Sequence, residues 1–303
     1  MYQNNLNLNL YKTFYEVAKY GSITEAAKQT FTSQPAISKS IKKLENELNV
    51  TLFYRTLSGV ELTEKGKELL YFVEQSFNSL TIAERNMIET NDLKKGRLSI
   101  GMPSNVGTFF LFDKVTDFHT LYPNIEITII TGSTSKLLEL LETHQIDFII
   151  DTSPINNIDK DIIVKPLLEV NYAFIAKKNT KLENIDKIKC LNDLKQYPLI
   201  LPIPGTANRN GLESLLLEKN IKINNILNIH TSEMIISAIK RDLGIGYVIE
   251  NLVENEVKNH ELILLDIAEE LPKVTINLIY NENYLTTAPI KFIKEYVLPD
   301  LNL

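Results

Sequence analysis

The chain has 303 residues, of which 44% are hydrophobic and 23% charged, and its net charge is −6. This length is too great for one small core and predicts two or three domains. The acidic balance excludes a protein that coats nucleic acid indiscriminately, and the single cysteine, Cys190, excludes an internal disulfide framework. The first residues lack the pattern of a secretion signal, and no run approaches about 18 apolar residues, so we expect a cytoplasmic protein without a membrane span.

The charge is unevenly distributed along the chain. Residues 1–62 hold seven Lys or Arg and five Asp or Glu, a net charge of +2, so the remainder carries −8. A mildly basic segment attached to an acidic remainder is typical of a local DNA-contacting surface on a protein that otherwise repels polyanions.

Hydrophobic spacing predicts three helices in the first 50 residues. The first covers residues 8–19 and ends at Gly21, and the second follows Ser22 as its N-cap and ends near Thr30. The third begins after Ser33 and has one apolar face, formed by Ile37, Ile41, Leu44 and Leu48. Two short helices joined by a tight turn, of which the second exposes small polar and basic residues, predict a helix-turn-helix.

The face of the third helix opposite its apolar stripe carries Gln34, Ser38, Lys39 and Lys42. In the major groove, Gln pairs with adenine and Lys with guanine, while Ser contacts bases or phosphates. On residue types alone, the alternative interpretation is a polar face that only meets solvent.

The order of residues across 8–66 resembles the LysR-type transcriptional regulators. The resemblance is carried by the segments GSITEAA (21–27), SQPAISK (33–39), IKKLE (41–45), LFYR (52–55) and LTEKG (62–66). It implies that the third helix enters the major groove and that a wing residue reaches the backbone or minor groove. The DNA-contacting residues predicted in this way are Ser33, Gln34, Pro35, Ser38, Lys39, Lys42 and Arg55.

Two positions in this region depart from the family's pattern. Asn49 stands where the family often has Gly after the third helix, and Asn is the next best residue for a left-handed cap. Ser58 stands where the wing often carries a second Arg, which predicts one phosphate contact fewer and a lower nonspecific affinity.

A long helix is predicted over residues 63–91, since this segment contains no proline and its only glycine is Gly66. About 28 helical residues span about 42 Å, far more than a small domain needs. Its apolar positions follow a spacing of three or four residues and comprise Leu70, Val73, Phe77, Leu80 and Met87. The helix either lies against its own domain or pairs two copies for two successive half-sites, and the resemblance implies dimerisation. Residues 94–96 are interpreted as a hinge.

After Gly96, strands and helices alternate, which predicts an α/β fold. This region resembles the two-lobed effector domain of the same family, which is related to periplasmic solute-binding proteins. We therefore expect a winged helix-turn-helix over 1–62, a dimerisation helix and hinge over 63–95, and an effector-binding domain over 96–303. Within the last, one lobe comprises 97–163 with 270–303 and the other 164–269, with crossovers near 162–166 and 268–272.

Ligands of open α/β sheets bind beyond the carboxyl ends of the strands, beside helix N-termini. Hydroxyl groups together with free helix N–H groups suit a carboxylate or similar small anion. The alternative for each single Ser or Thr is a helix N-cap. The candidate effector-binding residues are Pro103, Ser104, Asn105, Thr131, Ser133, Thr134, Pro204, Thr206, Arg209 and Thr231.

The candidate functions are a transcription regulator, a solute-binding protein without DNA function, and an enzyme. The second would require an export signal, and for the third no nucleophile–base pair can be assembled. The four histidines lack the spacing of metal ligands, so neither a metal nor a cofactor is expected. The expected partners are double-stranded DNA, further copies of the chain in a dimer or tetramer, a small-molecule effector and, for an activator, RNA polymerase.

Overall fold

The computed structural model describes residues 6–56, 59–88, 93, 95–155, 158–223 and 226–300. The chain divides into two compact units, Met1–Met87 with Glu142–Gln145, and Ile88–Leu141 with Ile146–Leu303. Among the described residues, no helix combines the length and the apolar character that a membrane span requires.

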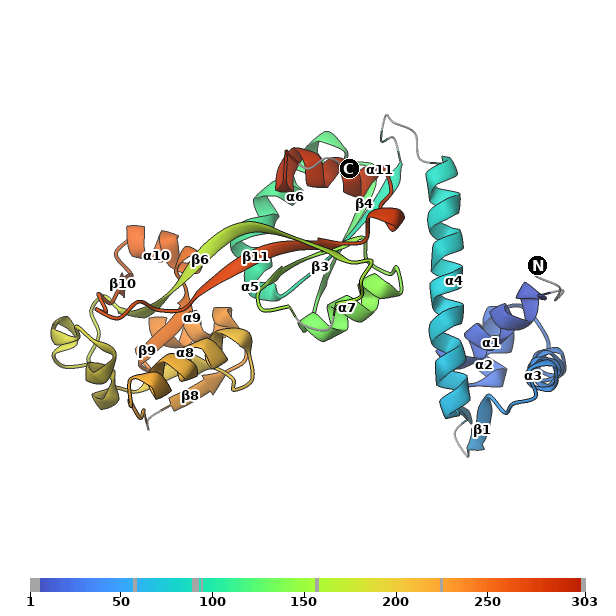
Figure 1. Ribbon diagram of the computed structural model, residues 1–303, viewed down its shortest axis with the longest axis horizontal. Helices are drawn as coiled ribbons and strands as arrows, with labels where there is room; N and C mark the ends of the chain where they lie inside the picture. The colour runs from blue at the N-terminus through green and yellow to red at the C-terminus, as the bar shows by residue number, and fades with distance from the viewer. Residues whose placement is uncertain are drawn as a thin grey trace. The chain divides into compact units, whose positions relative to one another are not determined.

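The first unit begins with three helices and a two-stranded antiparallel sheet, followed by a long helix (Figure 1). Its core is apolar and includes Phe14, Val17 and Leu44, whose side chains are fully buried. The predicted winged helix-turn-helix is thereby confirmed. The elements are α1 (Leu8–Tyr20), α2 (Ile23–Gln29), α3 (Gln34–Leu48), β1 (Phe53–Thr56), β2 (Gly59–Leu62) and α4 (Glu64–Ile88).

The helix ends lie at the capping residues that the sequence predicts. Gly21 ends α1 in a left-handed conformation at φ +60°, and Asn49 ends α3 in the same way at φ +54°. The Ser22 hydroxyl accepts a hydrogen bond from the amide three residues on at 3.3 Å, and Ser33 makes the equivalent bond at 3.4 Å. Each cap satisfies backbone groups that a helix end otherwise leaves unpaired.

Helix α4 starts at a cap of the same kind, but here the capping residue, Thr63, is buried. Its hydroxyl accepts from the amide of Gly66 at 2.9 Å and donates to the carbonyl of Thr51 at 2.8 Å. The predicted end of this helix near residue 91 lies outside the described residues.

The apolar stripe predicted for α4 is buried along only part of its length. Val73 is buried in the core of the first unit, and Leu70 and Phe77 pack partly against that core. Leu80 and Met87 continue the line of Val73 at intervals of seven residues but are 50% and 85% exposed, and Phe72, to one side of this line, is 56% exposed. The spacing therefore located the stripe, but it cannot say how far along the helix the core of the unit reaches.

The second unit contains one mixed sheet with the strand order β4-β3-β5-β11-β6-β9-β7-β8, and β10 pairs with β6. Strands β3, β4 and β5 are parallel in one lobe, and β7, β8 and β9 are parallel in the other. The first lobe is built from β3 (Gly96–Met102), α5 (Ser104–Val106), η1 (Gly107–Leu111), α6 (Phe112–Leu121), β4 (Ile125–Thr131), α7 (Thr134–Glu142), β5 (Phe148–Thr152), η5 (Glu282–Tyr284), α11 (Thr287–Phe292) and η6 (Ile293–Val297).

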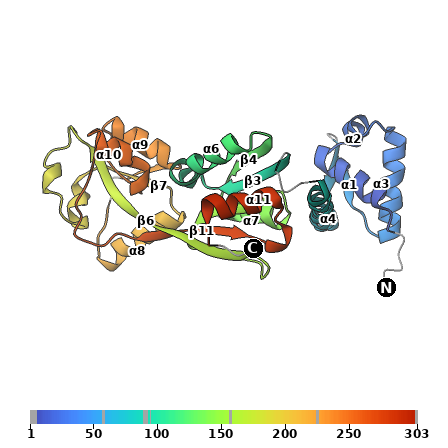
Figure 2. The same ribbon diagram turned by 90° about the horizontal axis from the view of Figure 1, so that it is seen from above.

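The second lobe follows the same strand–helix alternation. It is built from η2 (Ile185–Lys187), η3 (Leu191–Gln196), β7 (Leu199–Pro202), α8 (Ala207–Glu218), β8 (Ile226–Ile229), α9 (Ser232–Lys240), β9 (Ile245–Ile249), η4 (Glu250–Val253), α10 (Glu254–Lys258) and β10 (Leu262–Leu264). Two long strands, β6 (Ile163–Lys177) and β11 (Lys273–Tyr280), run antiparallel and join the lobes (Figure 2).

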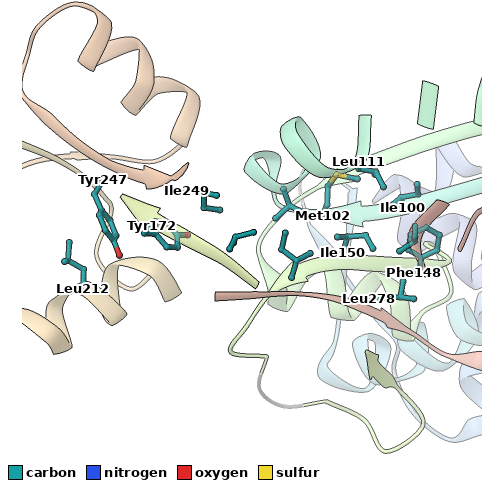
Figure 3. Packing of buried hydrophobic residues seen from close by; sticks show 14 of the residues in the cluster. Ile100, Met102, Leu111, Phe148, Ile150, Tyr172, Leu212, Tyr247, Ile249 and Leu278 are labelled. Carbon is teal, nitrogen blue, oxygen red and sulfur yellow. The ribbon is translucent and has the colours of Figure 1, made fainter. Parts of the chain in front are cut away.

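One strand prediction is corrected here. The strand expected near 173–176 is the last part of β6, which begins at Ile163, so the crossover expected near 162–166 lies within a strand. The first part of β6 pairs with β11, and its last part pairs with β9. The hydrophobic core continues through both lobes, with Ile100 and Phe148 in one and Tyr247 in the other (Figure 3).

Candidate DNA-reading surface and effector site

Helix α3 separates its apolar and polar residues cleanly. Ile37, Ile41 and Leu44 are buried, whereas most of the predicted DNA-contacting residues are exposed. Ser38 is the exception, because it is half-buried at the edge of the stripe. The exposed ones on or next to this helix are Ser33, Gln34, Pro35, Lys39 and Lys42.

The basic side chains of α3 differ in how their charge is paired. Lys43 lies 3.8 Å from the carboxylate of Glu47, one turn further along the same helix. Lys39 and Lys42 form no ion pair within 4 Å with any described residue. Their ammonium groups are therefore free to contact phosphates or base edges.

The wing presents Arg55, which is exposed on β1 and stands opposite Val60 on β2. The wing is fixed to the turn after α1, since the amide of Val60 donates to the carbonyl of Gly21 at 2.9 Å. A Cβ at Gly59 would lie 2.3 Å from that carbonyl oxygen, so this close approach requires glycine. Ser58, where the sequence predicts a lost phosphate contact, lies outside the described residues.

The turn between α2 and α3 holds a residue that the sequence reasoning missed. Phe31 is 98% exposed and has φ +52°, a left-handed conformation that strains a bulky side chain. The only signal in the sequence is an aromatic residue between two threonines in a turn. Its position two residues before Ser33 puts it at the edge of the exposed face of α3.

In the first lobe, the candidate effector residues follow the ends of β3 and β4. Pro103 precedes α5, with Ser104 and Asn105 in its single turn, and Thr131 is the last residue of β4. Ser133 accepts a hydrogen bond from the amide of Lys136 at 3.4 Å, which is the bond of a helix cap. The cap interpretation thus accounts for the Ser133 side chain.

Thr134 has a different partner, since its hydroxyl donates to Oδ2 of Asp151 at 2.7 Å. Asp151 is buried, and burial raises the pKa of its carboxyl above the ordinary value, while the hydrogen bonds from Thr134 and Thr152 oppose this shift. Sequence reasoning missed Asp151, because an acidic residue at the end of a strand gives no sign of being buried.

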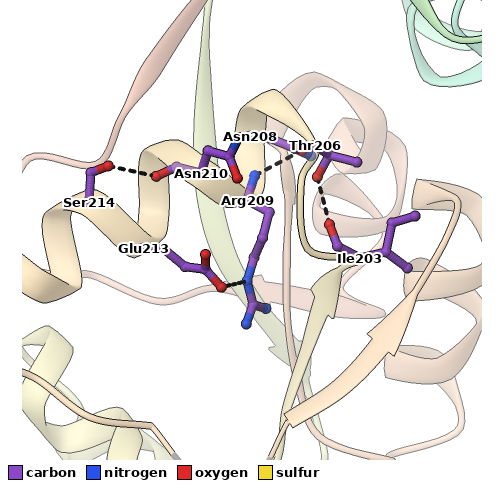
Figure 4. Close-up of polar contacts among 7 residues, drawn as sticks. All are labelled: Ile203, Thr206, Asn208, Arg209, Asn210, Glu213 and Ser214. Carbon is purple, nitrogen blue, oxygen red and sulfur yellow. Dashed lines mark hydrogen bonds and ion pairs between the residues drawn. The ribbon is translucent and has the colours of Figure 1, made fainter.

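In the second lobe, Thr231 caps α9 by accepting from the amide of Met234 at 3.3 Å. Thr206 stands in the equivalent position before α8 but does not cap it with its side chain. Its hydroxyl donates instead to the carbonyl of Ile203 at 2.9 Å, across the turn that contains Pro204 (Figure 4). The first turn of α8 therefore keeps amide groups that the N-cap side chain does not satisfy.

Arg209 lies in the first turn of α8 and is only 6% exposed. Its Nε donates to Oε1 of Glu213 at 2.6 Å, one turn along the helix (Figure 4). This residue is the only guanidinium among the candidate effector residues.

The carboxyl ends of the parallel strands in the two lobes are directed at each other. Met102 ends β3 and Ile249 ends β9, and both lie on the sides where the lobes face one another (Figure 3). One hydrogen bond joins the lobes here, since the hydroxyl of Thr108 donates to Oε1 of Glu233 at 3.3 Å. It brings the segment after Ser104 next to the segment after Thr231. Among the described residues, no hydrogen bond joins the Ser133 turn to the Thr206 turn.

A pocket of about 420 Å³ lies elsewhere in the second lobe. None of the candidate effector residues lines it. Its lining is formed by β6, η4, α10 and β10 and comprises Glu169, Val170, Asn171, Glu250, Asn251, Glu254, Val257, Lys258 and Leu264.

Two family models match this chain, one in the first unit and one in the second. The bacterial regulatory helix-turn-helix protein of the lysR family matches residues 8–67. The LysR substrate binding domain matches residues 91–300, more than half of the chain.

Curated relatives match over nearly the whole length. The uncharacterized HTH-type transcriptional regulator YoaU of Bacillus subtilis is 29% identical over 95% of this chain and 97% of its own. The HTH-type transcriptional activator CmpR of Synechocystis is 28% identical over 87% of this chain and 85% of its own. These relatives are named as transcriptional regulators and not as solute-binding proteins.

Solved structures share the fold at low sequence identity. ArgP from Mycobacterium tuberculosis covers 96% of both chains with a TM-score of 0.72 and 17% identity. Full-length CbnR in complex with its target DNA covers 96% of this chain and 99% of its own, with a TM-score of 0.66 and 18% identity. The chain therefore belongs to the LysR family of DNA-binding transcriptional regulators, which carry an effector-binding domain and are not enzymes.

Proposed function

We propose that this regulator binds DNA as a dimer with one α3 helix in each of two major-groove half-sites, and that a small anion held between the lobes controls this binding. The observation that carries the proposal is the exposed polar face of α3, opposite a fully buried stripe. Polar side chains that the fold does not use for itself, on a helix preceded by a tight turn, suit a partner outside the chain.

The side chains of this face divide between base and backbone contacts. Gln34, Ser38 and Lys39 suit base edges, because amide and ammonium groups match the donor and acceptor pattern of the major groove. Lys42 lies further along α3 and Arg55 on the wing, where both suit phosphates or the minor groove. Ser33 and Pro35 shape the N-terminus of the helix that approaches the DNA.

The test is fluorescence anisotropy with DNA from upstream of the regulator's own gene, at several salt concentrations. We expect a sequence-specific complex that weakens steeply with salt, and Lys39→Ala should weaken it. Lys43→Ala is the matched control, because Lys43 is on the same helix but is paired with Glu47. A wild-type complex that random competitor DNA displaces completely would contradict the proposal.

We assign dimerisation to the exposed apolar face of α4, formed by Phe72, Leu80 and Met87. The occupant is a second copy of this helix, because an exposed apolar stripe on a long helix suits pairing with its own equivalent. Leu80→Glu should yield monomers in sedimentation velocity, whereas Thr81→Glu, on another face of the helix, should not. A monomeric wild-type protein overturns this assignment, and a tetramer requires a second interface besides α4.

For the effector we propose a small anion, such as a carboxylate, bound where the carboxyl ends of β3, β4, β7 and β8 are directed at one another. Support comes from the first turn of α8, which Thr206 leaves uncapped. The protein then acts in the cytoplasm without any further cofactor, and an activating form would also contact RNA polymerase. Binding between the lobes would shift the population of their arrangements and thereby the spacing of the paired DNA-reading helices.

A thermal-shift screen of organic acids and amino acids against the full chain tests the effector proposal. The double variant Ser133→Val, Thr206→Val should lose the shift and keep its DNA affinity. A double variant that responds like the wild type would place the ligand elsewhere.

A further inference from the structure

The interior of the second lobe contains a group of polar side chains in an apolar setting. Arg209 is 6% exposed, Tyr247 0% and Tyr172 5%. On α8, Arg209 precedes Leu212 and Leu216 by three and seven residues, so a guanidinium occupies the buried face that these leucines continue. Buried Arg is uncommon unless its N–H groups find acceptors.

The hydrogen bonds of this group leave two buried polar atoms without a partner. The guanidinium of Arg209 donates through Nε to Glu213, but its Nη1 has no hydrogen-bond partner, and neither has the hydroxyl of Tyr247. Burial raises the pKa of the third member, Tyr172, and the neighbouring side chain of Asn208 opposes this shift. Both orphaned groups are donors, so they require an acceptor that the described chain does not supply.

The two orphaned groups belong to one region. The rings of Tyr172 and Tyr247 stack with centroids 4.9 Å apart at an angle of 20°, and the side chain that lowers the pKa of Tyr172 belongs to Asn208, the residue before Arg209. The hydroxyl of Tyr247 points toward Leu212, one turn beyond Arg209 on α8 (Figure 3). The N-terminus of α8 adds positive potential, because the Thr206 side chain does not cap it, although the Arg209 amide donates to Oδ1 of Asn208 at 3.0 Å.

We propose that Arg209 and Tyr247 bind a carboxylate group of the effector beneath the first turn of α8. A carboxylate has two oxygens that accept hydrogen bonds, one for the guanidinium Nη1 and one for the phenol. A monoanion fits better than a phosphate dianion, because Glu213 already offsets one positive charge and the surrounding walls are aromatic and aliphatic. This inference rests on the proposed effector function and assigns the residues that hold the charged group.

This subsite lies beside both segments that connect the lobes. Tyr172 belongs to β6, and a Cβ at Gly211 of α8 would approach the side chain of Pro272, next to the start of β11, at 3.3 Å. An anion bound here would therefore act where the connecting strands enter the second lobe. Such a position links occupancy of the subsite to the arrangement of the lobes.

The experiment uses the full-length protein with acetate and benzoate as probes, and with chloride and inorganic phosphate at matched ionic strength. Calorimetric titration and thermal shift should give saturable binding for a carboxylate and a much weaker effect for chloride and phosphate. Tyr247→Phe removes one oxygen and should weaken carboxylate binding about tenfold. Arg209→Gln should weaken it further.

Two control variants separate the subsite from general effects on the lobes. Tyr280→Phe changes a buried tyrosine of the first lobe, and Arg241→Gln an exposed arginine of the second, and both should bind like the wild type. Tyr247→Phe remains decisive if Arg209→Gln does not fold, because the change leaves the ring and its packing in place.

The outcomes distinguish this inference from the function on which it rests. Unchanged carboxylate affinity in Tyr247→Phe overturns the subsite, and equal binding of chloride or phosphate overturns the carboxylate assignment. An effector that still alters DNA binding in Tyr247→Phe with wild-type affinity leaves the proposed function standing without this subsite. If no organic acid stabilises the protein or alters its DNA complex, both the subsite and the anionic effector are overturned.

Discussion

The proposed DNA-reading helix and the effector-binding lobes present their polar groups in opposite ways. On α3, Gln34, Lys39 and Lys42 are exposed, and the helix ends behind them are fully capped. In the second lobe, Arg209 and Tyr247 are buried, and each keeps an atom without a hydrogen-bond partner. At α3 the helix ends are capped within the chain, and the exposed polar side chains are available to a partner. In the second lobe, two buried polar atoms have no hydrogen-bond partner within the described chain.

The difference follows from the size of the partner. Duplex DNA can only be contacted from outside, so its readers are long side chains on a convex surface. A small molecule can be enclosed, and burial strengthens each hydrogen bond to it because water is excluded. The two regions should therefore respond differently to substitutions in their cores, on their surfaces and at their buried charges.

Core substitutions should have the largest effect on stability, and each should impair the function of one region only. Leu44 in the first unit and Leu278 in the second are both fully buried. Replacing either by Ala should cost about 2–5 kcal/mol of folding free energy through lost burial and the cavity left behind. Leu44→Ala should abolish DNA binding and keep ligand-induced stabilisation, and Leu278→Ala should do the reverse, as followed by calorimetry. If both variants shift one common transition equally, the two regions do not fold as separate units.

Surface substitutions on α3 should have the next largest effect, on the free energy of DNA binding. They should distinguish residues that contact bases from residues that contact phosphates. Gln34→Ala should cost about 1–3 kcal/mol at the cognate site and relax the preference for one base pair. Lys42→Ala should instead weaken all sequences alike and reduce the slope of log affinity against log salt by about 1. Anisotropy titrations on a panel of single-base operator variants measure both. An unchanged base preference in Gln34→Ala would remove this residue from the reading face.

Local signals made the first unit predictable from its sequence. The stripe of Ile37, Ile41 and Leu44 and the caps at Ser22 and Asn49 act within a few residues, so spacing alone locates them. The same kind of signal located the α4 stripe, but it could not show that Val73 would be buried and that Leu80 and Met87 would be exposed. The DNA-contacting residues were predicted from residue type together with the family resemblance.

The effector region depends on contacts between distant residues, and much of it could not be predicted. Strand β6 is held along its first part by β11, more than a hundred residues later in the chain, and contains Pro166 and Glu169. The sequence marked Thr206 and Thr231 alike, but only Thr231 caps its helix. That Tyr247 lacks a partner is a property of its surroundings in space, for which no motif exists.

The buried carboxyl of Asp151 offers a smaller, pH-dependent test of the interior. Burial raises its pKa, and hydrogen bonds from Thr134 and Thr152 partly offset this shift. The folded state therefore favours the protonated acid, so the favourable contribution is present below the unfolded pKa of about 3.9 and is lost as pH rises through the folded value. Thermal midpoints measured from pH 4 to pH 7 should show this loss in the wild type.

Asp151→Asn should be more stable than the wild type at pH 7, because the amide carries no charge to bury. The difference between the two proteins should shrink as the pH falls toward 4. Equal thermal midpoints at every pH would mean that the hydrogen bonds to the Asp151 carboxylate fully offset the cost of burying its charge.

The smallest effect is expected in the first unit, at the strained turn before α3. Phe31 holds φ +52° with its ring almost wholly in solvent, so the fold gains little from the side chain and bears a disfavoured backbone conformation. Asn adopts this conformation more readily, and Phe31→Asn should raise stability by about 0.5–1 kcal/mol, measured as a higher urea midpoint. Thr32→Asn is the neighbouring control, since Thr32 is exposed but is not among the residues with positive φ. An exposed surface can tolerate backbone strain that a packed interior would not. A loss of stability in Phe31→Asn would show that the Phe31 ring packs against its own chain and stabilises the turn.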